Sequence, residues 1–172
     1  MRQISAFLLT LTVLLIGCTS DGTMVSISDR VNDEMEGVEF HPRLPTAVPF
    51  EVKEVRIDET TPKSTYVDVK VTDQLSIDVF GTNGEWLKIH ILKGNSGNGY
   101  EGEGVQTEEV SIGDDSGTYY KDDTEKQSVV WSEDDASYHM TYGYMDHENK
   151  SDSLNITKEQ LIKIAERFEK FE

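Results

Sequence analysis

The chain has 172 residues, of which 33 are acidic and 16 are Lys or Arg, so its formal net charge is −17. This acidity argues against nucleic-acid binding and against adsorption to an anionic lipid surface, because both need clustered basic side chains. A single cysteine excludes an internal disulfide and any metal site built from several cysteines. The length suits one domain, and a hydrophobic content of 36% is enough for a modest core.

The first 17 residues differ in character from the rest. Arg2 is followed by an apolar run from Ala6 to Ile16, which is shorter than the ~20 residues of a membrane-spanning helix. This order is typical of a cleaved secretory signal. The signal ends in Leu15-Ile16-Gly17-Cys18, which resembles a bacterial lipobox, where a small residue permits cleavage and the cysteine sulfur takes a diacylglycerol. The alternatives are an incidental thiol or a buried N-terminal helix.

Lipidation of Cys18 would place the protein on the outer side of the cell membrane. Two acyl chains anchor a protein stably, whereas one chain alone is marginal. We therefore expect residues 1–17 to be removed and the protein to be held at the membrane through Cys18, on its extracytoplasmic face.

Two segments lead into the predicted domain, which covers residues 40–172. Residues 18–39 are polar and without sustained periodicity, which predicts a flexible tether, with a short helix around Asp29–Met35 as the open alternative. The stretch Phe40–Phe50 contains three of the four prolines. Because proline restricts φ and biases its predecessor to extended backbone, we expect a stiff segment that lies against a sheet without forming a strand.

Alternation of apolar and polar residues predicts strands through most of the domain. Its phase changes at Lys53–Glu54, which predicts a β-bulge, and Asn83-Gly84 is typical of a hairpin turn. Lys93–Gly104 is rich in glycine and predicts a loop, and Glu133-Asp134-Asp135 predicts a second hairpin turn. The predicted strands are Phe50–Ile57, Val67–Val71, Leu75–Val79, Leu87–Ile91, Val110–Ile112, Thr118–Lys121, Ser128–Ser132 and Ala136–Tyr144.

One helix is predicted at the C-terminal end. Thr157 and Gln160 have the spacing of a capping box. An apolar stripe follows at Leu161, Ile164, Ala165, Phe168 and Phe171. A stripe of this kind needs a partner, so the fold class is predicted as α+β: a curved antiparallel β-sheet of about six to eight strands, packed by one C-terminal α-helix.

No residue pattern indicates catalysis, a metal or a cofactor. The sequence has no Gly-x-Ser-x-Gly elbow and no HExxH motif. The acidic pairs do not fit the spacing of a calcium-binding loop. The four histidines are scattered, and His90 and His139 are expected at exposed or rim positions because they alternate with apolar residues. We therefore expect a non-enzymatic protein without cofactors.

Aromatic residues give the only candidate ligand or partner surface. Such side chains can line a groove for a lipid, a glycan or a peptide, although they can equally fill the core between sheet and helix. The candidates are Trp86, Trp131, Tyr138, Tyr142 and Tyr144, with Tyr100 in the glycine-rich loop.

Several motifs resemble the DUF4367 family. They are Val129-Val130-Trp131, the aromatic-rich strand at Tyr138–Tyr144, the segment Ile156–Glu166, and the proline-rich opening at Leu44–Phe50. The resemblance covers about Phe40 to Phe171 and implies an extracytoplasmic protein or lipoprotein of Bacillus-like Firmicutes. It also implies a layout similar to lipoprotein-carrier and periplasmic sigma-regulator domains, in which a curved sheet cups an apolar ligand or a partner segment. The family has no catalytic residues to carry over.

Three functions follow as hypotheses. The first is a membrane-anchored, non-catalytic domain that binds an unknown protein or apolar ligand through the sheet face. The second is a lipid or lipoprotein carrier, which requires an apolar cavity between sheet and helix. The third is an envelope hydrolase, which requires two carboxylates, or a histidine and a carboxylate, converging in a cleft.

Overall fold

The computed structural model describes residues 23–60, 73–94, 105–121, 126–144 and 156–171. The predicted signal peptide with Cys18, the strand predicted at Val67–Val71, most of the glycine-rich loop, and Tyr100 lie outside these residues.

The main element is a seven-stranded antiparallel sheet with the strand order β4-β5-β6-β10-β9-β8-β7. Two small two-stranded ribbons, β1-β3 and β2-β11, accompany it. The helices are α1 (Ser28–Glu34) and α2 (Lys158–Ala165). The strands are β1 (Val25–Ser26), β2 (Arg43–Pro45), β3 (Ala47–Val48), β4 (Val52–Thr60), β5 (Gln74–Gly81), β6 (Glu85–Lys93), β7 (Gln106–Ile112), β8 (Asp115–Lys121), β9 (Gln127–Glu133), β10 (Ala136–Tyr144) and β11 (Phe168–Lys170).

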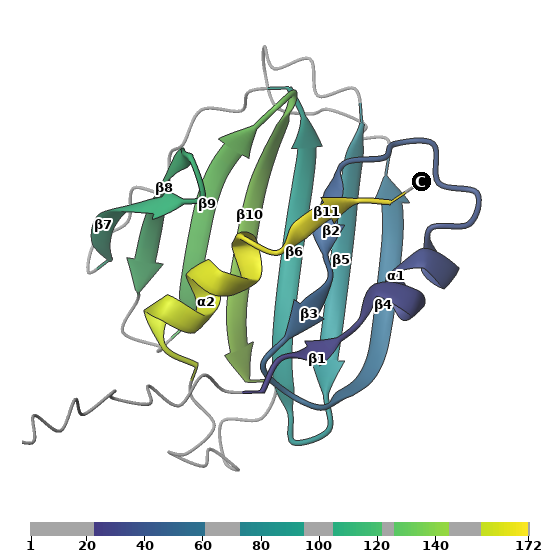
Figure 1. The fold of residues 1–172 in the computed structure, drawn as a ribbon, viewed down its shortest axis with the longest axis horizontal. Coiled ribbons are helices and arrows are strands. Elements are labelled where there is room, and N and C mark those ends of the chain that lie inside the picture. Colours follow the sequence, from purple (N-terminus) through teal and green to yellow (C-terminus); the bar gives the residue numbers. More distant parts are fainter. Residues whose placement is uncertain (1–22, 61–72, 95–104, 122–125, 145–155, 172) are drawn as a thin grey trace, which may run out of the picture.

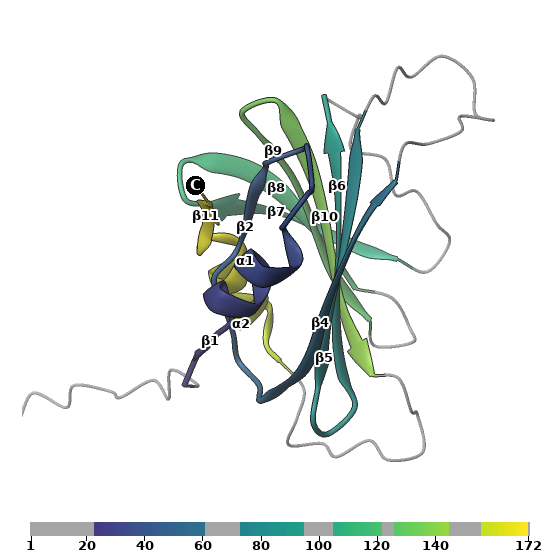
Figure 2. The same ribbon diagram turned by 90° about the vertical axis from the view of Figure 1, so that its right-hand side faces the viewer.

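Helices α1 and α2 and both ribbons lie on one face of the sheet, and no helix of the described residues covers the other face (Figures 1 and 2). The predicted α+β class and the number of strands in the main sheet are therefore confirmed. The structure adds one helix, α1, where the sequence left a short helix as an open alternative.

Local sequence signals explain the main features of the sheet. Burial alternates residue by residue along β5 and β6, as a strand with one packed face requires. The pairing of β4 with β5 shifts between Val52 and Glu54, so the predicted bulge is confirmed. Gly84 has a φ of 88° in the turn before β6, and Asp134 has a φ of 53° in the turn between β9 and β10, both of which need the left-handed region.

An aromatic cluster fills the core between the sheet and the C-terminal segment. The rings of Trp131 and Tyr138 stack with centroids 4.7 Å apart and planes 9° apart. The Phe168 ring meets Trp131 edge-on at 5.2 Å and Tyr138 at 5.7 Å. All three side chains are at most 2% exposed, so the space between sheet and helix is occupied at this place by protein side chains.

The N-terminal segment belongs to the folded domain, and the flexible tether predicted over residues 18–39 is wrong for its described part. Val25 and Ser26 pair with β3, and helix α1 follows at once. Ile27, Val31 and Met35 are buried in the core. These three residues follow one another at intervals of four and therefore share one face of the helix, a stripe too short for periodicity to reveal.

The proline-rich segment and the C-terminal segment both differ from the prediction, because they pair with each other as strands. The proline-rich segment forms two strands, and Arg43–Pro45 pairs with β11. The C-terminal helix, predicted to reach Phe171, ends at Ala165, and Phe168–Lys170 is a strand. Pairing with β2 supplies the hydrogen bonds that a further helical turn would have made, and it keeps Phe168 in the core.

The helix start agrees with the prediction. The Thr157 side chain accepts a hydrogen bond from the backbone N–H of Gln160 at 3.2 Å, and the Gln160 side chain accepts one from the N–H of Thr157 at 2.9 Å. This reciprocal capping box satisfies two of the donors left free at a helix start.

Candidate functional site

A shallow depression of about 240 Å³, here named the outer groove, lies on the face of the sheet opposite the helices. It is lined by Trp86, Lys88, His90, Val105, Tyr120, Lys126, Ser128, His139 and Thr141. The volume is slightly below the roughly 300–1,000 Å³ of ligand pockets in general. The outer groove is thus large enough for a ring or a short chain of a ligand.

Strand register brings this lining together from four strands. Thr141 of β10 stands between Lys88 of β6 and Ser128 of β9, and Ser128 pairs onward with Tyr120 of β8. Because directly opposed residues point to the same face of a sheet, these side chains form one continuous row. A second row places His139 directly opposite His90, and a third places Gly143 opposite Trp86.

Trp86 is fixed in position by polar contacts. Its indole N–H donates to the carboxylate of Asp78 at 2.9 Å. The ammonium of Lys88 lies 6.0 Å from the centroid of the indole and 3.6 Å from the other oxygen of Asp78. Trp86 is partly exposed. Its ring is therefore fixed in orientation and still accessible from outside the sheet.

Gly143 lies close to two side chains that line the outer groove, Lys126 and Trp86. A Cβ atom at this position would lie 3.5 Å from Cγ of Lys126 and 3.8 Å from Cε3 of Trp86. Both side chains therefore lie over the backbone of Gly143, and the missing side chain leaves them room. Lys88, by contrast, lies over the indole ring itself.

The two histidines supply neutral polar groups at physiological pH. Burial lowers the pKa of His139, and burial together with the nearby Lys88 and His139 lowers the pKa of His90. Both imidazoles are therefore mostly uncharged at pH 7.5. Nε2 of His139 lies 3.3 Å from the Thr141 hydroxyl, whereas the buried Nδ1 of His90 has no hydrogen-bond partner among the described residues. They are half-buried rather than fully exposed, so the expected rim position is right only in part.

The predicted aromatic surface is separated by the structure into two groups. Trp131, Tyr138 and Tyr142 are at most 2% exposed and belong to the core, so their assignment to a ligand surface is wrong and the alternative assignment to the core is right. They stand at alternating positions of paired strands and point toward the helices. Tyr144 is partly exposed at the strand end and accepts a hydrogen bond from the Tyr142 hydroxyl at 3.1 Å.

Of the five candidates, Trp86 alone lines the outer groove. Sequence reasoning missed the groove's other members, because a lysine, a histidine or a threonine facing outward from a strand is ordinary. Their convergence depends on which strands are neighbours, a property that no local pattern contains.

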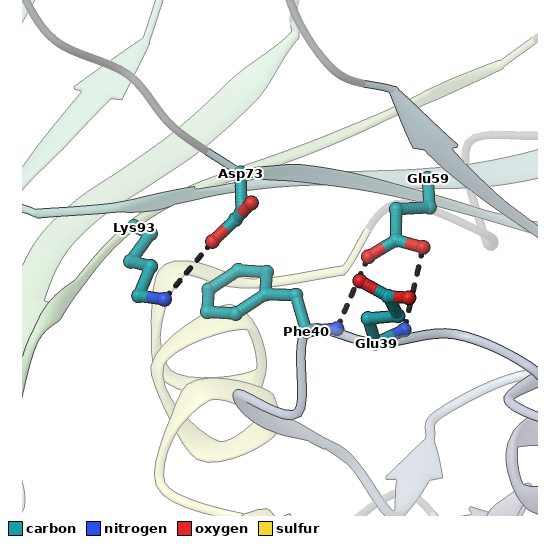
Figure 3. A network of polar contacts seen from close by, with 5 residues as sticks. All are labelled: Glu39, Phe40, Glu59, Asp73 and Lys93. Atoms are coloured by element: carbon teal, nitrogen blue, oxygen red, sulfur yellow. Dashed lines mark hydrogen bonds and ion pairs between the residues drawn. The ribbon is translucent and has the colours of Figure 1, made fainter.

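A second concavity, of about 430 Å³, lies where the segment before β2 crosses the sheet. Figure 3 shows how that segment is held. The carboxylate of Glu59 accepts the backbone N–H groups of Glu39 at 3.3 Å and of Phe40 at 3.0 Å. The Phe40 ring lies 5.9 Å from the ammonium of Lys93, which pairs with Asp73 at 3.0 Å.

The cations that line this second concavity are paired with carboxylates. Besides the pair of Lys93 with Asp73, Arg43 pairs with Glu133 and Lys170 pairs with Asp134 at 3.0 Å. The groups that border this space therefore hold the proline-rich segment and β11 in place. We therefore interpret the second concavity as a structural feature that the ion pairs stabilise, and not as a binding site.

The described residues contain neither a metal-binding cluster nor a membrane-spanning helix. Within them, no group of three or more His, Cys, Asp or Glu side chains is placed to hold a metal ion. None of the helices in the described part of the chain is both long enough and apolar enough to cross a bilayer.

Comparison with known proteins gives the family. An antiparallel sheet with helices on one face and an aromatic core defines an α+β domain, and the family model for the domain of unknown function DUF4367 matches residues 68–167. The match covers more than half of the chain, so the chain belongs to the DUF4367 family. It begins later than the resemblance suggested, since the proline-rich opening lies outside it. No curated protein and no solved structure matches the chain.

Proposed function

We propose that this protein is a membrane-anchored extracytoplasmic lipoprotein whose DUF4367 domain is a non-catalytic binding domain. It binds an apolar group of its ligand in the outer groove, against Trp86. The observation that carries the proposal is a partly exposed indole, held by Asp78 on the one sheet face that the helices do not cover. Aromatic side chains that combine an apolar body with a fixed polar contact are favoured at binding surfaces.

The carrier hypothesis has no observation in its favour. It needs an apolar cavity between sheet and helix, whereas the described residues there form the stacked cluster of Trp131, Tyr138 and Phe168. We therefore propose the binding domain alone.

The anchor rests on Cys18, and the position of β1 makes it a short one. Val25, the first residue of β1, stands seven positions after Cys18, and an extended chain of seven steps spans at most about 25 Å. The domain would therefore be held close to the membrane surface, and a ligand would be bound within that distance of the lipid headgroups.

Removal of the cysteine tests the anchor. In Cys18→Ala, we expect loss of labelling by a palmitate analogue and release of the protein from the membrane fraction, because no acyl chain can be attached. Globomycin treatment of the wild type should cause the uncleaved precursor to accumulate, which serves as the control for processing. Equal labelling of wild type and variant would contradict the anchor and the localisation together.

A neutral fluorescent probe tests the binding domain. We expect N-phenyl-1-naphthylamine to bind the wild-type mature chain and to bind Trp86→Ala about tenfold more weakly, since one aromatic contact contributes ~0.5–1.5 kcal/mol beyond area burial. The measurement is a fluorescence titration. Phe40→Ala is the matched control, because it removes an aromatic ring from the second concavity, and its affinity should stay within twofold of wild type. Equal binding by wild type and Trp86→Ala would contradict the proposed site.

A further inference from the structure

We infer that the ligand group held in the outer groove is an uncharged sugar ring, whose apolar C–H face lies on Trp86 and whose hydroxyls bond to Ser128 and Thr141. This inference rests on the proposed function and names the class of ligand. It is carried by a chain of hydrogen bonds across the groove and by the contacts that the charged side chains of the groove already make.

The charged side chains at the outer groove have partners within the protein. Lys88 pairs with Asp78, and Asp78 also accepts the indole N–H of Trp86. Lys126, the other lysine of the lining, has an interaction of its own. The two histidines are mostly neutral at pH 7.5. A charged ligand would have to compete with these contacts, whereas an uncharged ligand leaves them in place.

A chain of hydrogen bonds runs along the groove from β10 to β9. Nε2 of His139 lies 3.3 Å from the Thr141 hydroxyl, which lies 2.9 Å from the hydroxyl of Ser128. All three residues line the groove. The Ser128 hydroxyl makes no other side-chain hydrogen bond among the described residues. Because a hydroxyl has one donor and two acceptor sites, Ser128 keeps capacity for a ligand at the end of the chain.

This chain can run in either direction. If Ser128 donates to Thr141 and Thr141 donates to His139, the Ser128 oxygen is left to accept. If His139 donates and Thr141 donates onward, the Ser128 hydroxyl is left to donate. A ligand hydroxyl fits both states, since it donates and accepts. An acyl chain fits neither and would leave Ser128 without a partner for this capacity, which is unfavourable in a desolvated site.

The position of the indole relative to the hydroxyl pair suits a sugar ring. Gly143 stands directly opposite Trp86, and Thr141 stands two residues from Gly143 on the same strand. Diagonal neighbours of this kind are about 7–8 Å apart in a sheet. A sugar ring has apolar C–H groups on its face and hydroxyls at its edge. When the face lies on Trp86, hydroxyls at the edge can therefore reach toward Thr141 and Ser128.

Titration with oligosaccharides tests the inference. Cellotetraose and tetra-N-acetylchitotetraose, both uncharged, are titrated at millimolar concentrations into the mature chain, Trp86→Ala, Ser128→Ala and Ser132→Ala, and binding is followed by ligand-observed NMR. Ser132→Ala is the matched control. Ser132 lies on the same face of β9 as Ser128, and its hydroxyl likewise meets one on β10, that of Ser137, at 3.2 Å. It is not among the described residues that line the groove.

We expect at least one of the two oligosaccharides to bind the wild-type chain, and Trp86→Ala to bind it about tenfold more weakly. Ser128→Ala should bind it about three- to tenfold more weakly, because one hydrogen bond to the ligand is lost. Ser132→Ala should stay within twofold of wild type. The neutral dye N-phenyl-1-naphthylamine should bind Ser128→Ala as it binds wild type. Circular dichroism of each variant checks that the fold is intact.

The outcomes distinguish the inference from the proposed function. If neither oligosaccharide binds while the dye still depends on Trp86, the sugar is overturned in favour of a wholly apolar ligand, and the binding site stands. Equal binding of the oligosaccharide by wild type and Ser128→Ala, or equal weakening by Ser132→Ala, also overturns the inference. If neither the dye nor an oligosaccharide depends on Trp86, the inference and the proposed function are both overturned.

Discussion

Replacement of Phe168 by alanine is expected to lower the free energy of unfolding by about 3–5 kcal/mol. Phe168 is 1% exposed, and its ring meets both Trp131 and Tyr138 edge-on. The substitution removes these contacts and leaves a cavity beneath β11, which the paired strands cannot close by collapsing. Urea denaturation followed by circular dichroism, compared with wild type, measures the change.

Phe171→Ala is the matched control for Phe168→Ala. Phe171 is partly exposed, so we expect a loss of about 1 kcal/mol or less. If α2 continued to Phe171, the two phenylalanines would share one helix face. Their replacement by alanine would then lower the free energy of unfolding by similar amounts. Comparable destabilisation by the two substitutions would therefore contradict strand β11 and the core position of Phe168.

Replacement of Gly117 by alanine is expected to destabilise the sheet by about 1–3 kcal/mol through overpacking. A Cβ atom on Gly117 would lie 2.9 Å from the backbone oxygen of Val130 and 3.2 Å from Cβ of Trp131. Neither atom can move without shifting β9, so the strain must spread through the pairing of β8 with β9. The same denaturation measurement applies.

Gly143→Ala provides the comparison for Gly117→Ala within the same sheet. A Cβ atom on Gly143 would make ordinary contacts of 3.5 Å with Lys126 and 3.8 Å with Trp86. We expect a change of about 0.5 kcal/mol or less. If the two alanine variants are equally stable, the close approach of β8 to β9 at Gly117 is not as the structure has it.

The outer groove lies entirely within the part of the chain that matches the family model. The match over residues 68–167 includes β5, β6, β10 and α2, and therefore all the residues that line the groove. Glu59 and Phe40, which are joined by a hydrogen bond, precede the match. The proposed binding site thus lies in the part of the chain that matches the family model, whereas β1 and α1 precede that part.

The sequence by itself determined the local elements. Alternation along β5 and β6, the phase change at Lys53–Glu54, and the capping box at Thr157 each depend on residues a few positions apart. Strand pleat, bulge and helix cap are short-range structures, so residues that are neighbours in sequence are sufficient to predict them.

Tertiary structure decided which elements meet. The short stripe of Ile27, Val31 and Met35 became a helix because a sheet face was there to bury it, and Phe168 entered a strand because β2 offered unpaired backbone groups. Pairing between strands likewise placed Lys88 opposite Thr141 and His90 opposite His139. The pairings of β6 with β10 and of β2 with β11 join residues 43 to 127 positions apart in the sequence. No local pattern specifies pairings over such separations, so the sequence predicted the strands, whereas only the tertiary structure located the groove.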